Sequence, residues 1–306
     1  MQIDSKTKLR RGLQNGSSTS LNWRVTQAIH GVGHKLVNRR VSTVAVGTAF
    51  VLLMTALPFT SSIDSVAFAN GTQNCPSSTP WGTALDQNGV EMGINNDDWN
   101  GGHQCARNTD NGADFTVTNQ GSIVPKQSND STAPPQAYPD LIYGCSNTMC
   151  YSSGWPKLVS SIGYWYATGN INTTAETGDD WDANYDLWFN RTDNIGPSRG
   201  AELMINFNHQ GRSPHGTLLG EPNLGGSVYD VYEQQRTSGS YTWNYVDFWR
   251  ENTTSSVSHL QLNQFMSYAI NAGAMQSSWY WTGIDSGFET WYEGAGLQWL
   301  YDFIST

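Results

Sequence analysis

Basic residues are scarce in most of this sequence. The chain of 306 residues has 16 lysines and arginines against 26 aspartates and glutamates, and eight of the basic residues lie within residues 1–40. Residues 70–306 therefore hold eight basic and 24 acidic residues, a net charge of −16. Such a surface offers no basic stripe to a phosphate backbone, so we expect no nucleic-acid partner. It does not repel a neutral polymer such as a polysaccharide.

Long hydrophobic runs are also missing, except for residues 41–57. This run follows the basic residues 1–40 and precedes the pattern Ala67-Phe68-Ala69. A basic stretch, an apolar stretch and a small-x-small site in this order predict a secretory signal over residues 1–69, cleaved after Ala69. The secreted product, residues 70–306, has 237 residues, which suits one all-β catalytic domain.

Three alternatives to this signal stay open. A membrane-spanning signal anchor is the minor one, because the apolar run is short for a span and contains Ser, Thr and Gly. The basic region is long for a signal, so a translation start further downstream is a second alternative. Arg39-Arg40 is compatible with a twin-arginine signal. In each case we expect one domain without internal repeats that touches the membrane only through its signal and is a monomer.

Cysteine is rare, with only Cys75, Cys105, Cys145 and Cys150 present. An even number in a secreted chain is typical of disulfides, and four cysteines allow three pairings. We expect Cys75–Cys105 and Cys145–Cys150, because both bridges close local loops. A zinc site is the less favoured alternative, since the paired C-x-x-C spacing is missing, and we therefore expect no metal.

Several catalytic motifs are absent from the sequence. It contains no G-x-S-x-G elbow, no P-loop, no G-x-G-x-x-G and no H-E-x-x-H. Other hydrolase chemistry therefore finds little support, and we expect no cofactor. His209 and His215 are interpreted as loop or groove-wall residues.

What the sequence does have in quantity is Gly, Asn, Ser and Thr, placed between short aromatic and β-branched runs. This texture predicts an all-β sandwich or jelly roll. Residues 122–138 are expected to form a long loop. The predicted strands are 164–167, 184–190, 201–208, 227–233, 241–250, 279–283, 286–291 and 297–303.

One segment has a helical period instead. Its apolar residues recur at i, i+3, i+4, i+7 and i+8, and Gly273 is placed to end it. These residues are Leu262, Phe265, Met266, Ala269 and Ile270. The pattern predicts a single amphipathic helix packed under a sheet.

Two short segments, 201–208 and 287–291, each place one glutamate on an otherwise strand-like background. Side chains alternate along a strand, so one face of the first is apolar, whereas the other holds Glu202, Met204, Asn206 and Asn208. Glu289 lies in the second strand. A polar face with a carboxylate suits a cleft better than a core, and its side chains are predicted to contact a substrate. Two carboxylates facing each other across a cleft are the minimum equipment for hydrolysing a glycosidic bond.

A third acid lies mid-strand among aromatic residues. In 184–190, Asp186 and Trp188 share the face opposite to the one that carries Tyr185. An acid in such surroundings is costly unless it is paired or functional. We expect Asp186 to hydrogen-bond the Glu202 carboxylate and hold its orientation. A structural aspartate bonded to backbone amides is the alternative.

Tryptophan is abundant, with 12 in residues 70–306. Core packing and β propensity explain most of these rings. Sugar rings, however, present apolar C–H faces that stack on aromatic rings. Trp81, Trp99 and Trp291 are the candidates for the aromatic floor of a cleft.

Three strand-like segments carry a more specific signal: Tyr185-Asp186-Leu187-Trp188-Phe189, Ala201-Glu202-Leu203-Met204-Ile205 and Gly287-Phe288-Glu289-Thr290-Trp291. They resemble the signature strands of glycoside hydrolase family 12, which contains secreted endo-β-1,4-glucanases and xyloglucanases. The likeness continues in order over nearly all of residues 70–306. It includes Cys75…Trp81-Gly82, Asn95-Asn96-Asp97-Asp98-Trp99, Tyr138-Pro139, Gly144-Cys145…Cys150, the 214–216 turn, the lone helix and Gly294-Ala295-Gly296-Leu297.

The resemblance implies a jelly roll of two curved antiparallel sheets, with a β-glucan groove on the concave face and one packed helix. By this resemblance Glu202 matches the nucleophile, Glu289 the general acid/base and Asp186 the acidic partner of the nucleophile. Trp81 and Trp99 match aromatic residues of the groove. The local disulfides of the family also agree with the pairing given above.

Two positions depart from the family pattern. The family usually continues Glu-Leu-Met-Ile with Trp, whereas this chain has Asn206, which does not supply the same stacking surface. The turn usually written Gln-Pro-Ile-Gly reads Ser213-Pro214-His215-Gly216, which alters a residue of the groove wall. We expect a change in affinity or preferred substrate, with the three carboxylates untouched.

The expected activity is retaining endo-hydrolysis of β-1,4-glucan linkages in cellulose-like, mixed-linkage or xyloglucan polymers. Retention requires carboxyl groups roughly 5–5.5 Å apart. A non-catalytic, lectin-like glucan-binding jelly roll is the main alternative, although it does not need two opposed glutamates. A xylanase of the related jelly-roll family is another, and the contexts Glu-Leu-Met-Ile and Gly-Phe-Glu-x-Trp argue against it.

Overall fold

The computed structural model describes residues 73–74, 81–85, 91–97, 104–108, 112–118, 134–146, 148–173, 178–197 and 200–306. All of them belong to one compact unit, Ile63–Thr306. The predicted signal, 1–69, and most of the predicted loop 122–138 lie outside the described residues. Within the described ranges, no helix is both long and apolar enough to cross a membrane.

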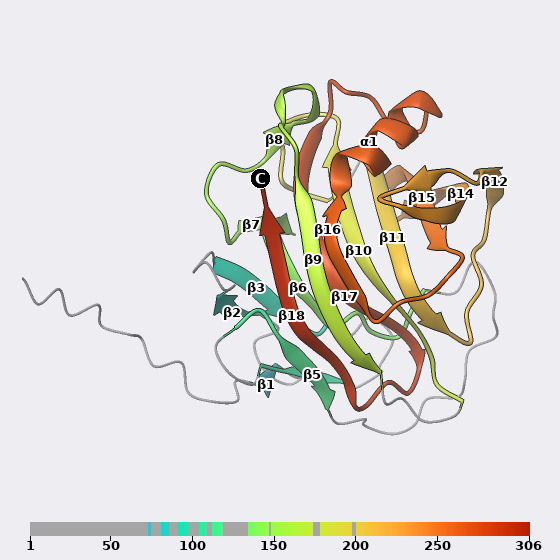
Figure 1. Cartoon of the computed structure of the whole chain (residues 1–306). Coiled ribbons are helices and arrows are strands. Elements are labelled where there is room, and N and C mark those ends of the chain that lie inside the picture. Colours follow the sequence, from blue (N-terminus) through green and yellow to red (C-terminus); the bar gives the residue numbers. More distant parts are fainter. Residues whose placement is uncertain are drawn as a thin grey trace, which may run out of the picture. The chain divides into compact units, whose positions relative to one another are not determined.

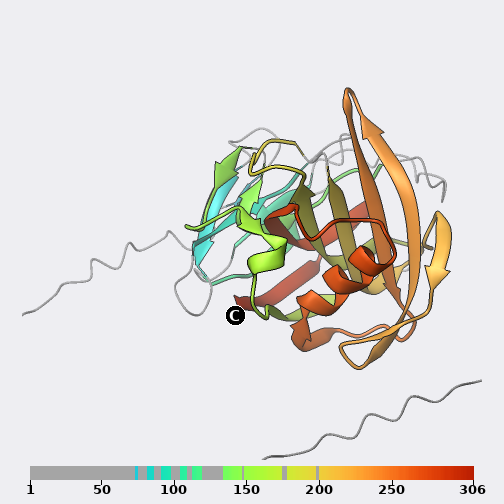
Figure 2. The same ribbon diagram turned by 90° about the horizontal axis from the view of Figure 1, so that it is seen from above.

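Two β-sheets packed face to face form the body of the fold (Figure 1). The smaller sheet has the strand order β1-β4-β5-β18-β9-β16. Its strands are β1 (Gln73–Asn74), β4 (Cys105–Arg107), β5 (Phe115–Thr118), β9 (Tyr166–Thr173), β16 (Ser256–Gln261) and β18 (Leu297–Ser305). In Figure 1, β9, β16 and β18 cross in front of the larger sheet, and Figure 2 shows the layers from above.

The larger sheet has the order β12-β14-β15-β11-β10-β17-β6-β3-β2, with β13, β7 and β8 attached to β14, β6 and β17. Its main strands are β2 (Trp81–Leu85), β3 (Glu91–Asn95), β6 (Asp140–Ser146), β10 (Asp180–Asn190), β11 (Ala201–Gln210), β12 (Thr217–Gly220), β14 (Ser227–Ser238), β15 (Tyr241–Arg250) and β17 (Tyr280–Tyr292). The attached strands are β7 (Met149–Cys150), β8 (Lys157–Leu158) and β13 (Asn223–Leu224), and a short 3-10 turn, Val159–Ser161, follows β8. The predicted jelly-roll class is confirmed.

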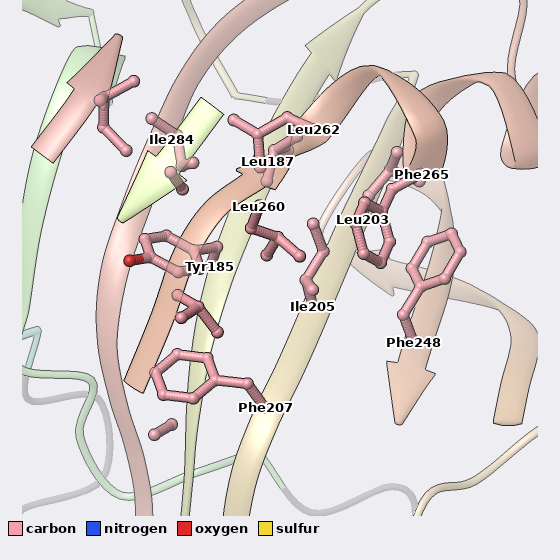
Figure 3. Close-up of a cluster of buried hydrophobic side chains, with 14 of the residues drawn as sticks. Tyr185, Leu187, Leu203, Ile205, Phe207, Phe248, Leu260, Leu262, Phe265 and Ile284 are labelled. Carbon is pink, nitrogen blue, oxygen red and sulfur yellow. The ribbon is translucent and has the colours of Figure 1, made fainter. Parts of the chain in front are cut away.

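The core lies between the two sheets and is built by alternate residues of each strand. On β10 these are Tyr185, Leu187 and Phe189, all fully buried. Figure 3 shows Tyr185 and Leu187 beside Leu203 and Ile205 of β11. Aromatic rings from the two sheets meet here, because Tyr185 contacts Trp299 of β18 edge to face at 5.6 Å between ring centroids.

The predicted amphipathic helix is confirmed as α1 (Leu262–Asn271). Its residues Leu262, Phe265, Met266 and Ala269 are buried in the core, and Phe265 packs edge to face on Phe248 of β15 with 5.1 Å between ring centroids (Figure 3). Gly273 follows the helix with φ +84°, a conformation that glycine adopts without steric cost and that ends helices.

Three details differ from the sequence-based expectation. The predicted strands 279–283 and 286–291 form one strand, β17, because Ile284 and Asp285 pair with β6 on one side and with β10 on the other. The predicted strand 164–167 begins only at Tyr166 and continues to Thr173. The larger sheet is also not wholly antiparallel, since β11 and β15 run parallel. The chain makes this parallel return through β12 and β14.

Candidate active site

A polar face lies on the side of the larger sheet away from the core. On β10 the residues between the core-facing ones are Asp182, Asn184, Asp186 and Trp188, and the first three are almost completely buried. Burying so many polar side chains on one face is costly unless they are hydrogen-bonded or functional. The sequence-predicted acids Glu202, Glu289 and Asp186 all come to this face, on the adjacent strands β11, β17 and β10.

Glu202 lies on β11, opposite Trp188 of β10 and Tyr245 of β15. Its carboxylate accepts a short hydrogen bond from the indole N–H of Trp243. Burial raises the pKa of Glu202 to about 7, while the charge of Arg236 and the Trp243 hydrogen bond hold it down. Glu202 therefore has two neighbours that favour its ionised form.

Glu289 lies on β17, opposite Asp182 of β10, and keeps a partly exposed side chain. Burial raises the pKa of Glu289 well above its ordinary value, and the charge of Asp182 raises it further. The charges of Glu202 and Asp247 act in the same direction, and Arg236 opposes them. Glu289 is thus the acid that holds its proton to the higher pH.

The two glutamates flank the same strand at different positions along it. Glu202 pairs with Trp188 and Glu289 with Asp182, so they are six residues apart along β10. Their carboxyl groups nevertheless interact electrostatically, because the charge of Glu202 raises the pKa of Glu289.

Asp186 lies between them on β10, opposite Met204 of β11 and Asp285 of β17. Burial raises its pKa well above the ordinary value, and the nearby charge of Glu202 is the next largest cause. The expected hydrogen bond from Asp186 to Glu202 is not formed: Trp243 donates to Glu202 instead, and Asp186 Oδ1 has no hydrogen-bond partner among the described residues. The reason is the strand register, which places Trp188 rather than Asp186 opposite Glu202.

A hydrogen-bonded network fixes the polar residues around Asp186. The Tyr138 hydroxyl donates to Asn184 Oδ1 at 2.6 Å, and Asn184 Nδ2 donates to Asp182 Oδ1 at 2.7 Å. The Trp188 indole N–H donates to Asp285 Oδ2 at 3.0 Å. Strands β10 and β17 and the segment before β6 are thereby linked, so the side chains are held in place before any substrate binds.

The cavities on this face lie near the two glutamates. One, of about 390 Å³, includes Trp188, Trp243, Tyr241 and Asp285 in its lining, and the two indole rings are 6.3 Å apart. A smaller one is lined in part by Glu289, Asp182, Asp247, Arg212 and Arg236. The first offers aromatic faces and the second offers charged hydrogen-bonding groups, as expected of a groove that binds a sugar polymer.

The predicted substrate contacts on β11 have different surroundings. Met204 is fully buried. Asn206 is buried too, and its Nδ2 donates to Asp247 Oδ1 at 2.6 Å, so its amide is engaged in the sheet rather than offered as a surface. Asn208 is partly exposed and accepts a hydrogen bond from the backbone N–H of His209. In place of a tryptophan on β11, Trp249 of β15 lies opposite Asn206.

The structure describes the three predicted groove tryptophans to different extents. Trp291 lines the smaller cavity, but one face of its ring is covered by the Arg212 guanidinium, 3.8 Å from the ring centroid. Trp81 is the first residue of β2 and pairs with Asn95 of β3. Only its backbone belongs to the part of the chain that the structure describes. Trp99 lies outside the described residues.

One predicted disulfide is confirmed. Cys145 of β6 and Cys150 of β7 are bridged. Cys105 is disulfide-bonded as well, but Cys75 lies outside the described residues, so its pairing stays a prediction. Among the described residues, no group of three His, Cys, Asp or Glu side chains is placed to hold a metal ion.

Sequence reasoning missed the groove residues of β15 and both arginines. The signal was available for β15, because Trp243, Tyr245, Asp247 and Trp249 alternate with the buried Val246 and Phe248. That alternation marks a second strand with a groove face, which is aromatic and polar, beside the polar face of β11. Arg212 and Arg236 had no such signal: their guanidinium groups reach the groove from the 211–216 turn and from β14.

Comparison with known proteins agrees with this arrangement. The model of glycosyl hydrolase family 12 matches residues 90–305. The chain is 29% identical over 139 residues to the "Probable cellulase Cel12b" of Mycobacterium tuberculosis, covering 45% of this chain and 83% of that protein. It is 30% identical over 165 residues to "Endoglucanase S" of Pectobacterium parmentieri, covering 52% of this chain and 61% of that protein.

Solved structures give the same result. A metagenome-derived family 12 endoglucanase superposes with a TM-score of 0.66 and 26% identity, covering 77% of this chain and 97% of that one. The endoglucanase Cel12A from Rhodothermus marinus superposes with a TM-score of 0.65 and 28% identity, covering 76% and 98%. The chain belongs to glycosyl hydrolase family 12 and is a glycoside hydrolase.

Proposed function

We propose that this protein is a secreted, retaining endo-β-1,4-glucanase in which Glu202 is the nucleophile and Glu289 the general acid/base. One observation carries the assignment. The two glutamates lie on the strands that flank β10, in one groove, with neighbours that favour the ionised form of Glu202 and the protonated form of Glu289. Separating the pKa values of two carboxyl groups is how glycosidases assign these roles.

The reaction follows in two steps. In the first, a Glu202 oxygen bonds to the anomeric carbon, the glycosidic C–O bond breaks, and the leaving oxygen takes the proton of Glu289. In the second, water gives a proton to Glu289 and attacks the same carbon, and the ester to Glu202 breaks. The Trp243 N–H then stabilises the released Glu202 carboxylate.

Asp186 influences the ionisation of the nucleophile without a direct hydrogen bond to it. It is buried one row of the sheet away from Glu202, and the two carboxyl groups disfavour each other's ionisation. A protonated Asp186 therefore leaves the single negative charge on Glu202. This makes Asp186 a positioning residue of the proposed mechanism.

The groove suits a neutral polysaccharide. Trp188 and Trp243 offer ring faces beside Glu202, and Trp81, Trp99 and Trp291 remain proposed contacts further along a bound chain. Asn206 bonded to Asp247 leaves the groove without the stacking surface of the usual family tryptophan. We therefore expect mixed-linkage glucan and xyloglucan to be hydrolysed faster than crystalline cellulose, because their chains do not form flat, ordered layers.

A first experiment tests reaction and stereochemistry together. Purified residues 70–306 are incubated with soluble mixed-linkage β-glucan, and reducing ends, viscosity and the first-formed anomer are followed, the last by proton NMR. An endo-acting retaining enzyme lowers the viscosity early and releases the β-anomer first. Release of the α-anomer contradicts the double displacement, and binding without new reducing ends supports the lectin-like alternative. Faster turnover of xylan contradicts the glucanase assignment.

Secretion and oligomeric state are tested separately. Expression of the full chain in a secreting bacterial host, followed by N-terminal sequencing, should give Asn70 as the first residue. A membrane-bound product that keeps residues 41–57 supports the signal anchor instead. Sedimentation of the secreted product should give the mass of a monomer.

A further inference from the structure

The outward face of α1 carries no charged residue. The whole helix reads LNQFMSYAIN, and its first and last turns hold no acidic or basic side chain. A surface helix usually presents charged residues to water on the side away from the core. In a chain with a net charge of −10, a solvent-exposed helix with amide, hydroxyl and aromatic groups alone needs an explanation.

A depression of about 360 Å³ lies over this face. The described residues around it are all uncharged: Tyr164, Leu224, Gln261, Asn263, Gln264, Ser267, Tyr268 and Asn271. Asn263, Ser267 and Asn271 are spaced i, i+4 and i+8, so they form one stripe along the helix. At 1.5 Å per residue this stripe is about 12 Å long.

Tyr164 borders the depression and is 66% exposed. Its position is fixed, because both neighbouring residues are held by Asn263 of α1. Asn263 Nδ2 donates to the Gly163 carbonyl at 2.7 Å, and the Trp165 N–H donates to Asn263 Oδ1 at 2.6 Å. The Leu262 N–H also donates to the Trp165 carbonyl. An exposed aromatic ring on a clamped backbone loses little entropy when a ligand stacks on it.

Gln264, which also borders the depression, is held by two hydrogen bonds. Its Oε1 accepts from the Gly225 N–H at 2.7 Å, and its Nε2 donates to Gln261 Oε1 at 3.0 Å. Ser267 and Asn271 are exposed and offer their hydroxyl and amide groups to solvent, with Tyr268 between them. The arrangement combines one rigid ring with uncharged donors and acceptors, which is the chemistry that sugar rings and their hydroxyl groups match.

We propose that this surface, defined by Tyr164, Ser267, Tyr268 and Asn271, is a second binding site for a neutral β-glucan chain. It is separate from the groove, because α1 packs on Phe248, whereas the neighbouring residue Asp247 points into the groove on the other face of β15. A polymer held here keeps its other segments near the catalytic face at a high effective concentration. The binding itself does not depend on the proposed hydrolytic activity.

Affinity electrophoresis in native gels containing soluble barley β-glucan tests the proposal, with binding to swollen cellulose as a second readout. Tyr164→Ala and the double variant Ser267→Ala/Asn271→Ala are compared with Leu300→Ala, which shortens a similarly exposed apolar side chain on β18. We expect retention by the polymer to fall about threefold to tenfold in the first two and to be unchanged in the third. Thermal unfolding checks that all three variants are folded.

Hydrolysis of a short aryl cellobioside separates this site from the groove. We expect Tyr164→Ala to cleave it at the wild-type rate while losing polymer retention. Wild-type retention in both site variants overturns the proposal, and so does a dimer that Tyr164→Ala dissolves without any loss of retention. If no variant cleaves β-glucan but retention still depends on Tyr164, the proposed function fails and this inference stands.

Discussion

The two parts of the groove hold one glutamate each, but they surround it differently. At Glu202, Trp243 donates a hydrogen bond and Arg236 supplies positive charge, while Trp188 lies opposite on β10 and Asp186 is a nearby acid. At Glu289 the neighbours are mainly acidic, with Asp182 opposite on β10. Burial alone raises both pKa values, so the neighbours decide which carboxyl ionises first.

This contrast shows how one β-sheet can supply both an ionised and a protonated carboxyl group at the same pH. The strand between the two glutamates presents Trp188 to one and Asp182 to the other. The direction of the pKa difference depends on Arg236 of β14 and Trp243 of β15 near Glu202, and on Asp182 of β10 opposite Glu289. Changing a neighbour should move one pKa without the other, and changing a glutamate should remove one chemical role without the other.

Substituting each glutamate in turn should have the largest effect, because each substitution removes one of the two catalytic roles. We expect Glu202→Gln to lower kcat on β-glucan about 10⁴-fold or more, roughly 5.5 kcal/mol of barrier, because no covalent intermediate forms. Glu289→Gln should be similarly slow on β-glucan. On an aryl cellobioside with a good leaving group it should recover a large part of the rate of the first step, because that step then needs no proton.

The measurements are kcat on β-glucan and, on the aryl cellobioside, kcat/KM, which reports the first step alone. Circular dichroism verifies that both variants are folded. If Glu202→Gln, and not Glu289→Gln, recovers rate on the substrate with the good leaving group, the two glutamates have the opposite roles. The same response in both variants contradicts any division of labour.

Trp243→Phe should change the pKa of Glu202 without changing that of Glu289. The indole N–H stabilises the ionised carboxylate, so its loss raises the pKa of Glu202. Activity requires ionised Glu202, and the acidic limb of the kcat/KM profile should therefore move to higher pH. A charge-assisted hydrogen bond is worth about 1.5–3 kcal/mol, so we expect a tenfold to hundredfold loss on the acidic side.

Trp188→Phe is the matched control, because its N–H donates to Asp285 and not to Glu202. Its acidic limb should stay in place whatever its effect on KM. Equal displacement of the limb in both variants means that general loss of packing, rather than the hydrogen bond, is responsible.

Substitution of Arg236 should test whether one positive charge lowers the pKa of both glutamates. Its guanidinium lies over the Tyr245 ring, 4.2 Å from the centroid, and its charge lowers the pKa of Glu202 and of Glu289 alike. Arg236→Met should therefore raise both pKa values and move the whole bell-shaped profile to higher pH, with a several-fold loss at the original optimum. Arg236→Lys keeps the charge and should keep the profile. Movement of only one limb contradicts the shared effect.

Sequence patterns predicted those strands and helices in which apolar residues recur with a regular period. The alternation in 201–208 and the helical period from Leu262 to Ile270 were sufficient to find β11 and α1, because burial selects the same side chains that the pattern marks. They did not predict the continuity of β17. Ile284 and Asp285 read as a break, although pairing with β6 and β10 on both sides keeps them in the strand.

The candidate acids were also predictable, whereas their partners were not. Glu202, Glu289 and Asp186 stand out locally as carboxylates on strands. Which donor reaches Glu202 depends on a parallel pairing of β11 with β15, between residues about 40 positions apart. Register across such distances is fixed by packing of the whole sheet, and a one-residue shift turns every side chain to the other face. The contact of Arg212 with Trp291 has the same origin.

The smallest expected effect concerns stability and an acid that the proposed reaction does not use. Asp140 of β6 is fully buried near Asp285, and burial followed by that charge raises its pKa well above the usual value. The folded state thus binds a proton that the unfolded state releases near pH 4, so the stabilisation is present at low pH and is lost as the pH rises toward the folded-state pKa. Asp140→Asn keeps the shape without this cost. We expect the variant to be more stable than wild type by about 1 kcal/mol at pH 8 and no more stable at pH 4, measured by thermal unfolding. Exposed Asp193→Asn is the control, and an equal gain at both pH values in Asp140→Asn contradicts a titration effect.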